Sequence, residues 1–297
     1  MPKKRVVVTI LSIFLLVLVF TGCPTDSVPG GGGPGVSSSK YVVLGYNDLG
    51  MHCMNQDFST LMILPPYNTL HAQVIERRGE EPRIVQSGVT VQYSIPGNTD
   101  STDDTNFWDF APALFNIASL PANIGLTGNG LSGTMTPTGD NDWSVTGIPI
   151  TPIDDQGNEN AYQLSSIVVK SAGQQVAATQ AVVPVSWEIS CDLCHVPNTG
   201  ETVDMDILRD HDRLHSTHLV DSTPVMCGSC HAQAPLGTTG SPGVPSLSHA
   251  MHSAHASRMS AVSLEVNCYA CHPGVRTQCL RDVHLAHGKD CYDCHGT

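Results

Sequence analysis

Cysteine and histidine recur together, at a fixed spacing, in the last part of this 297-residue chain. Four stretches share the pattern CxxCH: "CDLCH" from Cys191, "CGSCH" from Cys227, "CYACH" from Cys268 and "CYDCH" from Cys291. Cysteine pairs of this spacing can bind zinc or act as a thioredoxin-like redox pair. Neither chemistry requires a histidine directly after the second cysteine, yet all four pairs have one. That histidine is the feature that a function has to explain.

The repeated CxxCH pattern resembles the attachment motif of the multihaem c-type cytochromes. The resemblance implies four c-type haems, each joined to its motif by two thioether bonds and ligated on one side of the iron by the motif histidine. The cofactor-binding cysteines are then Cys191, Cys194, Cys227, Cys230, Cys268, Cys271, Cys291 and Cys294. The iron ligands within the motifs are His195, His231, His272 and His295.

Eight further histidines lie among the motifs, and an HxxH pair precedes three of the four. Residues three or four apart share a face of a helix, so His211, His215 and His218 could present two imidazoles to neighbouring irons. As sixth ligands we expect His218, His287, His252 and His215, ahead of His255, His249, His211 and His284. The histidines left over would be surface residues or partners of haem propionates. Alternative axial ligands are the thioethers of Met205, Met226, Met251 and Met259, and candidate propionate partners are Arg258, Arg276, Arg281 and Lys289.

The segment that carries the motifs, residues 188–297, is poor in the residues that build a hydrophobic core. It holds nine of the chain's eleven cysteines and twelve of its fourteen histidines, but no Phe or Trp and only two Tyr. Such a segment cannot bury enough apolar surface to offset its conformational entropy by itself. Porphyrin rings would supply the missing hydrophobic mass. We therefore expect residues 188–297 to form a mostly irregular, short-helix tetrahaem cytochrome c domain.

Residues 40–187 have the pattern of β-strands instead. Apolar and polar residues alternate through Val89–Ile95 and again from Val183 to Ile189, as in strands with one buried face. Residues 162–185 predict a hairpin that turns near Ala172-Gly173, and Pro184 predicts that its second strand lies at an edge or contains a bulge. The predicted fold is therefore mixed. An all-β sandwich, with an immunoglobulin-like arrangement as one option, precedes the haem domain.

The first 39 residues are predicted to direct and tether the protein. A basic cluster at residues 3–5 precedes an apolar run at residues 6–20, which is typical of a secretory signal and short for a membrane span. The end of this run resembles a bacterial lipobox, which implies a signal peptide of residues 1–22 and a lipid on Cys23. An ordinary signal peptide or an uncleaved anchor is the alternative. Residues 23–39, rich in Gly, Pro and Ser, are expected to form a flexible tether.

Residues 46–74 of the first half gather sulfur and imidazole groups: Met51, His52, Cys53, Met54 and His71. Three interpretations are open. The groups could bind copper. His52 or His71 could cap the first haem, whose motif has no HxxH pair before it. The segment could also simply pack within the sandwich, with Cys53 either buried or bonded to Cys279, since exported proteins commonly pair the cysteines left outside their motifs.

These features predict electron transfer along or beyond the cell envelope, because haem irons with two imidazole ligands have no open position for a substrate. One alternative is an enzyme with one open iron that reduces a small oxyanion or a sulfur species. Another is a subunit of a cytochrome filament or membrane electron-transfer complex. We expect redox partner proteins or an extracellular acceptor, and a lipid anchor in the outer membrane, facing the periplasm or the cell surface. The net charge of −13 argues against nucleic acid as a partner, because such a chain repels phosphate.

Mass spectrometry of the mature protein tests the predicted amino terminus. We expect the chain to begin at Cys23 and to carry the mass of a lipid there, because cleavage at a lipobox leaves a lipidated cysteine as the first residue. A mature chain that begins elsewhere, or whose Cys23 is unmodified, would contradict the lipoprotein interpretation. The haem prediction does not depend on this result.

Overall fold

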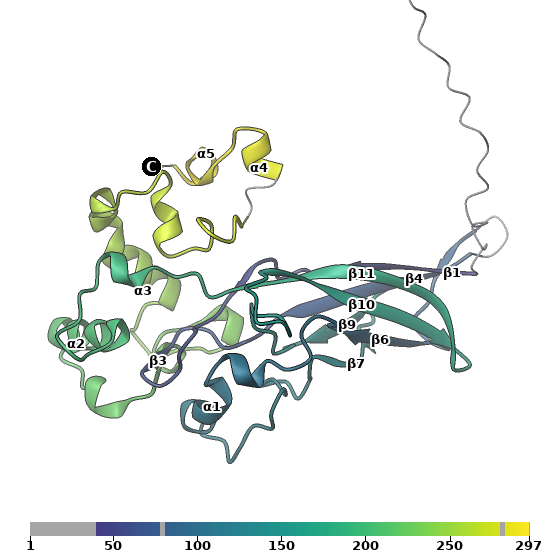
Figure 1. Ribbon diagram of the computed structural model, residues 1–297, viewed down its shortest axis with the longest axis horizontal. Helices are drawn as coiled ribbons and strands as arrows, with labels where there is room; N and C mark the ends of the chain where they lie inside the picture. The colour runs from purple at the N-terminus through teal and green to yellow at the C-terminus, as the bar shows by residue number, and fades with distance from the viewer. Residues whose placement is uncertain (1–39, 78–80, 280–282, 297) are drawn as a thin grey trace, which may run out of the picture. The chain divides into compact units, whose positions relative to one another are not determined.

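The alternating strands of the first half form two five-stranded sheets (Figure 1). The computed structural model describes residues 40–77, 81–279 and 283–296, so the predicted signal peptide, Cys23 and the tether lie outside the described residues. One sheet contains, in spatial order, β1 (Tyr41–Tyr46), β4 (Thr69–Glu76), β9 (Trp143–Thr146) and β8 (Thr136–Pro137), with β5 (Arg83–Ile84) beside β4. The other contains β2 (His52–Cys53), β11 (Gln174–Ser186), β10 (Tyr162–Ser171), β6 (Thr90–Ser94) and β7 (Ser132–Thr134).

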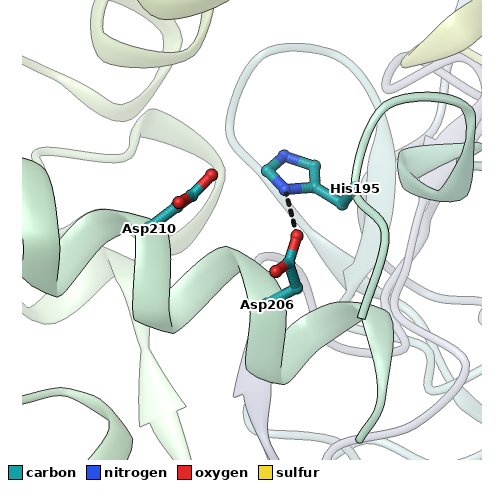
Figure 2. Close-up of side chains that lie close together, drawn as sticks. All are labelled: His195, Asp206 and Asp210. Atoms are coloured by element: carbon teal, nitrogen blue, oxygen red, sulfur yellow. Dashed lines mark hydrogen bonds and ion pairs between the residues drawn. The ribbon is translucent and has the colours of Figure 1, made fainter. Parts of the chain in front are cut away.

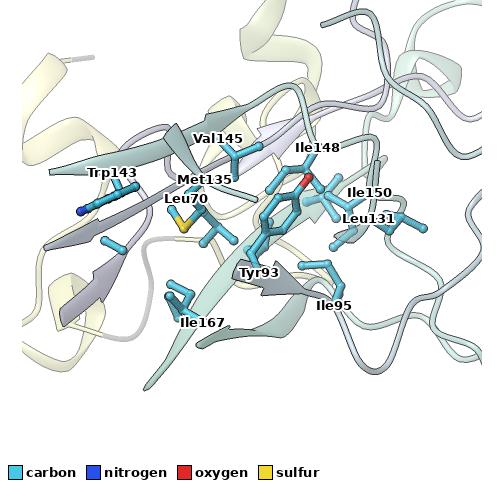
Figure 3. Packing of buried hydrophobic residues seen from close by; sticks show 14 of the residues in the cluster. Leu70, Tyr93, Ile95, Leu131, Met135, Trp143, Val145, Ile148, Ile150 and Ile167 are labelled. Atoms are coloured by element: carbon cyan, nitrogen blue, oxygen red, sulfur yellow. The ribbon is translucent and has the colours of Figure 1, made fainter. Parts of the chain in front are cut away.

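The inward faces of the two sheets share one hydrophobic core (Figure 3). Alternate residues of β4, namely Leu70, Ala72 and Val74, are fully buried, and so are Ile167 and Val169 on β10 of the other sheet. Each large apolar side chain buried in this way stabilises the fold by about 1.5–3 kcal/mol. A slip of one residue would turn each strand's apolar side chains to solvent, so this core sets the register. The result is a mixed, sheet-rich fold consistent with a β-sandwich.

The strands β10 and β11 form the predicted hairpin. Ser171 pairs with Gln174, and the two residues between them make the turn. Ala172 and Gly173 have φ angles of 47° and 79°, the left-handed values that a type I′ turn requires at both positions. Among the described strands, β11 has a neighbour only on its β10 side as far as Pro184, beyond which the two residues of β2 join it in parallel. The missing N–H of proline therefore falls where no ladder bond is needed.

A helix interrupts the strands of the first half. The prediction that this half is all-β is therefore wrong. The helix α1 (Phe107–Phe115) contains Pro112, a residue that disfavours helix interiors and that obscured this helix in the sequence. It ends at Asn116, whose left-handed backbone conformation is a common helix stop. One face of α1 packs into the sandwich core through Phe107, Trp108, Ala111 and Leu114.

The second half consists mostly of short helices, 3-10 turns and irregular backbone, as predicted, and contains one two-residue strand, β12 (Val225–Met226). Side chains at the helix starts act as caps, since Thr202 and Ser246 accept the backbone N–H groups of residues 205 and 249 at 3.2 and 3.3 Å. The described helices are α2 (Val203–His215), α3 (Leu247–His255), α4 (Val283–Ala286) and α5 (Cys291–His295). The 3-10 turns are η2 (Cys191–Leu193), η3 (Val220–Ser222), η4 (Cys227–Ser229), η5 (Ala234–Leu236), η6 (Ala256–Ala261) and η7 (Asn267–Ala270).

The described residues belong to one compact unit, in which the two halves are in contact. The strand β12 (Val225–Met226) pairs in parallel with β3 (Leu61–Met62) of the first half. Beside this pair, the side-chain amide of Gln233 donates to the carbonyl of Ile63 at 2.7 Å. The predicted domain boundary between residues 187 and 188 stays a prediction, because these contacts cross it.

Glu188 makes a second contact between segments far apart in the sequence. Its buried carboxylate accepts the backbone N–H groups of Arg276 at 2.7 Å, Thr277 at 2.8 Å and Gly274 at 3.3 Å, and the hydroxyl of Thr277 at 2.8 Å. Burial acts to raise the pKa of Glu188, but these hydrogen bonds outweigh it and hold the pKa below its ordinary value. The carboxylate therefore ties the loop at residues 274–277 to the end of β11.

Replacing this carboxylate tests how far the fold depends on it. Glu188→Gln keeps the shape but turns an amide N–H toward other N–H groups, so we expect the free energy of unfolding to fall by about 2–4 kcal/mol. Urea denaturation measures the loss, and Glu265→Gln, at an exposed glutamate of the same half, is the control.

The lowered pKa of Glu188 also predicts how this stabilisation depends on pH. Because the folded pKa lies below that of the unfolded chain, the stabilisation should be complete above about pH 4.3 and decline in more acid solution. Two results together would contradict the proposed role of Glu188. They are a Glu188→Gln protein with the same free energy of unfolding as the Glu265→Gln control, and a dependence of that free energy on acid pH that is the same as in wild type.

Candidate functional site

Three of the CxxCH motifs close the same turn of backbone. The N–H of the motif histidine donates to the carbonyl of the first cysteine at 3.0 Å in the motifs of Cys191 and Cys227, and at 2.9 Å in that of Cys268. The second cysteines of these motifs have φ angles of −127°, −108° and −120° and ψ angles of −32°, −34° and −28°. The fourth motif is the short helix α5. Three of the four motifs therefore repeat in conformation as well as in sequence.

The first cysteines of two motifs, Cys191 and Cys227, do not have the electrostatics of a redox dithiol. In every motif the first cysteine is half-buried and the second is exposed. Burial raises the pKa of the Cys191 and Cys227 thiols to about 11, so both are protonated at neutral pH. A thioredoxin-like pair instead needs a thiolate with a lowered pKa. The redox-pair interpretation of these two motifs therefore loses support.

Three motif histidines each lie opposite a histidine that a helix carries. One of the helix histidines comes from α2 and two come from α3. The facing pairs, with the separations of their ring centres, are His195 with His255 (6.3 Å), His231 with His211 (6.3 Å) and His272 with His252 (6.1 Å). The planes of the rings are inclined by 64°, 87° and 25°, in the same order.

Backbone hydrogen bonds determine which nitrogen of these rings carries the proton. The Nδ1 atoms of His231, His252 and His255 lie 2.8, 2.8 and 2.7 Å from backbone carbonyl oxygens. A carbonyl oxygen has no proton to give, so each Nδ1 must be the donor, and the lone pair of a neutral ring is then on Nε2. These three rings therefore present Nε2 as a free ligand atom.

Side chains hold the ring of His211 so that its Nδ1 is also the hydrogen-bond donor. Its Nδ1 lies 2.9 Å from the hydroxyl oxygen of Thr217, and that hydroxyl donates its own proton to Asp212 at 2.6 Å. The hydroxyl oxygen therefore accepts the Nδ1 proton of His211. Burial, followed by the nearby His215 and His231, lowers the pKa of His211 and favours the neutral ring. A neutral imidazole whose Nδ1–H is held in this way is the form that binds a metal through Nε2.

His195 is oriented by a carboxylate (Figure 2). Its Nδ1 lies 3.2 Å from Asp206 on α2, and Asp206 also pairs with Arg209. With Asp210, these residues form the one His, Cys, Asp or Glu group in the described part of the chain whose ligand atoms lie close enough for a single metal ion. The Nδ1 hydrogen bond and the charge of Arg209 already satisfy Asp206. We therefore assign Asp206 to orienting His195. The group also contains no cysteine, whereas a zinc ribbon requires cysteine ligands.

The structure brings only some of the predicted sixth ligands to the motifs. His252 lies opposite a motif histidine, whereas His215 lies against His211 with ring centres 4.8 Å apart. His218 and His287 are exposed. Sequence reasoning ranked His211 and His255 low, although both lie opposite motif histidines. The sixth-ligand assignments stay predictions, since the ring contacts by themselves do not establish a ligand.

The two histidines of the first half are held within the sandwich. His52 is buried, and its Nε2 lies 2.7 Å from the carbonyl oxygen of Pro65. His71 lies between two carboxylates, with Nε2 3.0 Å from Asp48 and Nδ1 2.6 Å from Asp142. Both ring nitrogens of His71 are thus engaged, and the ring of His52 is buried. The structure supports the third interpretation, in which this segment packs within the sandwich.

Cys53 lies at the contact between the two halves. Burial raises the pKa of its thiol to about 12, and the neighbouring Cys279 and Glu188 add to the effect. Cys53 and Cys279 are therefore close enough to interact electrostatically, while their disulfide stays a prediction. Met54, one of the proposed copper ligands, is fully buried in the sandwich core.

The cations predicted to pair with propionates have partners in the protein. Arg276 pairs with Glu159 at 2.8 Å, which adds to the contact between the halves. Lys289 lies 3.5 Å from Asp293, and Arg258 of η6 donates to the backbone carbonyl of Ala254 on α3. Arg281 lies outside the described residues. Pairing of these cations with propionates stays a prediction.

Comparison with known proteins does not add a relative. A scan against protein-family models, a search of curated proteins and a search of solved structures each found no match to the chain. Within the described ranges, no helix combines the length and the apolar character that crossing a membrane requires. The function of the site must therefore be argued from its own residues.

The buried His52 makes the stability of the sandwich depend on pH. Its pKa is about 4 in the folded protein because burial disfavours the charged ring. The pKa of a histidine in an unfolded chain is about 6.5. Between these values the unfolded chain binds the proton, so we expect the free energy of unfolding to fall by about 1.4 kcal/mol per pH unit of acidification.

The variant His52→Gln cannot take up this proton and should lack that part of the pH dependence. Urea denaturation of both proteins at several pH values between about 7 and 4 measures the difference. Other titrating groups contribute equally to the two proteins. Identical slopes in wild type and variant would contradict the assignment.

Proposed function

We propose that this chain is an exported tetrahaem c-type cytochrome that transfers electrons in the cell envelope. The observation that carries the proposal is that three motif histidines each face a second histidine, with ring centres 6.1–6.3 Å apart. A bond between a metal and an imidazole nitrogen is about 2 Å long, and that nitrogen lies roughly 1 Å from the ring centre. Two imidazoles on opposite sides of one iron therefore have centres about 6 Å apart. The three pairs fit this spacing.

The orientation of the ring nitrogens supports the same proposal. Aromatic rings packed in a core also have centres about 4.5–7 Å apart, so distance alone does not distinguish ligands from packed rings. In five of the six paired histidines, however, Nδ1 has a hydrogen-bond partner, a backbone carbonyl, a hydroxyl or a carboxylate. Metal-bound histidines have this arrangement, because it fixes the ring and leaves Nε2 for the metal.

The distribution of apolar side chains also supports haem. The buried hydrophobic residues described in the second half are Leu208, Leu247, Val266 and Ala270. Beside the first motif histidine, Leu193 and Val196 are 50% and 79% exposed. Exposed apolar groups next to a cofactor motif are what a covering porphyrin would explain, since it would remove them from water. The second half would then obtain from its cofactors the apolar contacts that its sequence lacks.

Bound haem would supply one-electron chemistry, because its iron can accept and release single electrons. The chain's own residues would hold the porphyrins through paired cysteines, occupy axial positions through paired imidazoles, and keep the imidazole protons at Nδ1. Axial positions taken by imidazole exclude water and substrate, which favours electron transfer over catalysis. The enzyme alternative needs an open iron, and His255 opposite His195 counts against the first motif for this role. The exposed His295 makes the fourth motif the remaining candidate.

As part of the proposal, a lipid on Cys23 anchors the protein in the outer membrane, facing the periplasm or the cell surface. Residues 188–297 contain six basic and twelve acidic residues. Their field attracts a basic redox partner or a metal-bearing acceptor more than an anion, and it repels nucleic acid. An oligomer or filament, and an immunoglobulin-like sandwich in the first half, complete the proposal.

The number of attached haems tests the proposed function. Mass spectrometry of the protein from a host that attaches c-type haems should show four haem additions, and the absorption spectrum should be mainly low spin. Cys191→Ala combined with Cys194→Ala should remove one haem, because its thioether bonds cannot form. Cys53→Ser, outside the motifs, should keep all four. A folded, colourless protein with zinc or disulfides at the motif cysteines would contradict the proposal.

A further inference from the structure

The helix α3 carries two of the facing histidines, and they face different motifs. His252 lies opposite His272 of the third motif, and His255 lies opposite His195 of the first. Side chains three residues apart on an α-helix point about 60° apart and are displaced by about 4.5 Å along its axis. Two imidazoles in this relation cannot occupy the same axial position of one iron. They can, however, reach two neighbouring centres from one helix.

The helix itself orients both rings. The Nδ1 of His252 donates to the carbonyl of Ser248 at 2.8 Å, and the Nδ1 of His255 donates to the carbonyl of Met251 at 2.7 Å. Each acceptor lies four residues earlier, so each ring is held against the preceding turn, with Nε2 left for a ligand. Leu247 at the start of α3 is buried, which fixes the helix in the fold.

Contacts that do not involve α3 bring the same two motifs together. The N–H of Ser190, directly before the first motif, donates to the carbonyl of Ala270 within the third motif at 3.0 Å. Glu188, two residues earlier, accepts the N–H of Gly274, just after the third motif, at 3.3 Å. The segments around the two motifs therefore lie side by side, as a shared ligand helix requires.

We propose that α3 supplies the sixth iron ligands of two haems, with His255 at the first motif and His252 at the third. The inference rests on the proposed function, because it needs haem at both motifs. It accounts for the absence of an HxxH pair before the first motif, whose ligand comes from the pair before the third motif. A displacement of α3 would then disturb both irons together.

Alanine variants of the two histidines test this ligation in the full-length, haem-loaded protein. His252→Ala and His255→Ala should each convert about a quarter of the haem iron from low spin to high spin. Both should retain four haems by mass, and added imidazole should restore the low-spin spectrum by filling the vacated position. His249→Ala, at an exposed histidine of the same helix, is the matched control and should stay low spin.

Removing one haem identifies the iron that each histidine ligates. In a chain with Cys191→Ala and Cys194→Ala, His255→Ala should add no further high-spin iron, whereas His252→Ala still should. The variant His255→Met gives a second test that keeps an axial ligand. It should keep the iron low spin and raise the midpoint potential of one haem only, because a thioether replaces an imidazole.

Electron paramagnetic resonance distinguishes the two sites without any cysteine variant. The ring planes of His252 and His272 are inclined by 25°, and those of His195 and His255 by 64°. Nearly parallel imidazole planes give a rhombic low-spin signal, whereas strongly inclined planes give a more anisotropic one. His252→Ala should therefore remove a rhombic signal, and His255→Ala an anisotropic one.

Three results would overturn the role of α3. The first is a His255→Ala protein that stays fully low spin. The second is a chain without the first haem in which His255→Ala still adds high-spin iron. The third is a His249→Ala protein with the same spectrum as the His252→Ala and His255→Ala proteins. In each case every intact motif keeps its haem, and the proposed function stands. A mature protein without haem would instead refute the proposed function, so the two failures are distinguishable.

Discussion

Hydrogen bonds at the Nδ1 atoms of the histidine rings determine which ring nitrogens of the second half can act as ligands. Most protein interiors hold their side chains by close packing, but this half has few buried apolar groups. Its rings are held instead by groups such as the Pro245 carbonyl behind His231 and Asp206 behind His195. Such a bond fixes the direction of a ring and also the position of its proton, so it decides which nitrogen can act as a ligand. On the haem proposal, the axial bonds of five of the six paired histidines depend on a partner on the far side of the ring.

Local features of the fold followed from the sequence, because their causes are local. The turn at Ala172-Gly173 needs only two residues that accept positive φ, and the alternation through Val89–Ile95 needs only one buried face. Three of the four CxxCH motifs likewise share one backbone turn. The helix α1 was missed because Pro112 argues against a helix, and its stability comes from the core that covers its apolar face.

The partner of each motif histidine could not be predicted, because it depends on contacts between distant segments. The sequence showed His252 and His255 as an HxxH pair before the third motif. It could not indicate that the first motif lies beside the third, which follows from the bond between Ser190 and Ala270 and from the loop held by Glu188. In the same way, composition alone made His71 a candidate ligand, whereas two carboxylates from separate segments occupy both of its nitrogens.

The short strand β12 pairs with β3, a two-residue strand of the first half that lies outside the two five-stranded sheets. Leu61 and Met62 of β3 are buried, and carbonyl groups beside them accept N–H groups from Val225 and Gln233 of the second half. A first half without these partners would expose an apolar strand edge with unpaired carbonyl groups, and such edges recruit strands from other molecules. The sandwich on its own would consequently be prone to aggregate. The first half therefore depends on the second half to cover this edge.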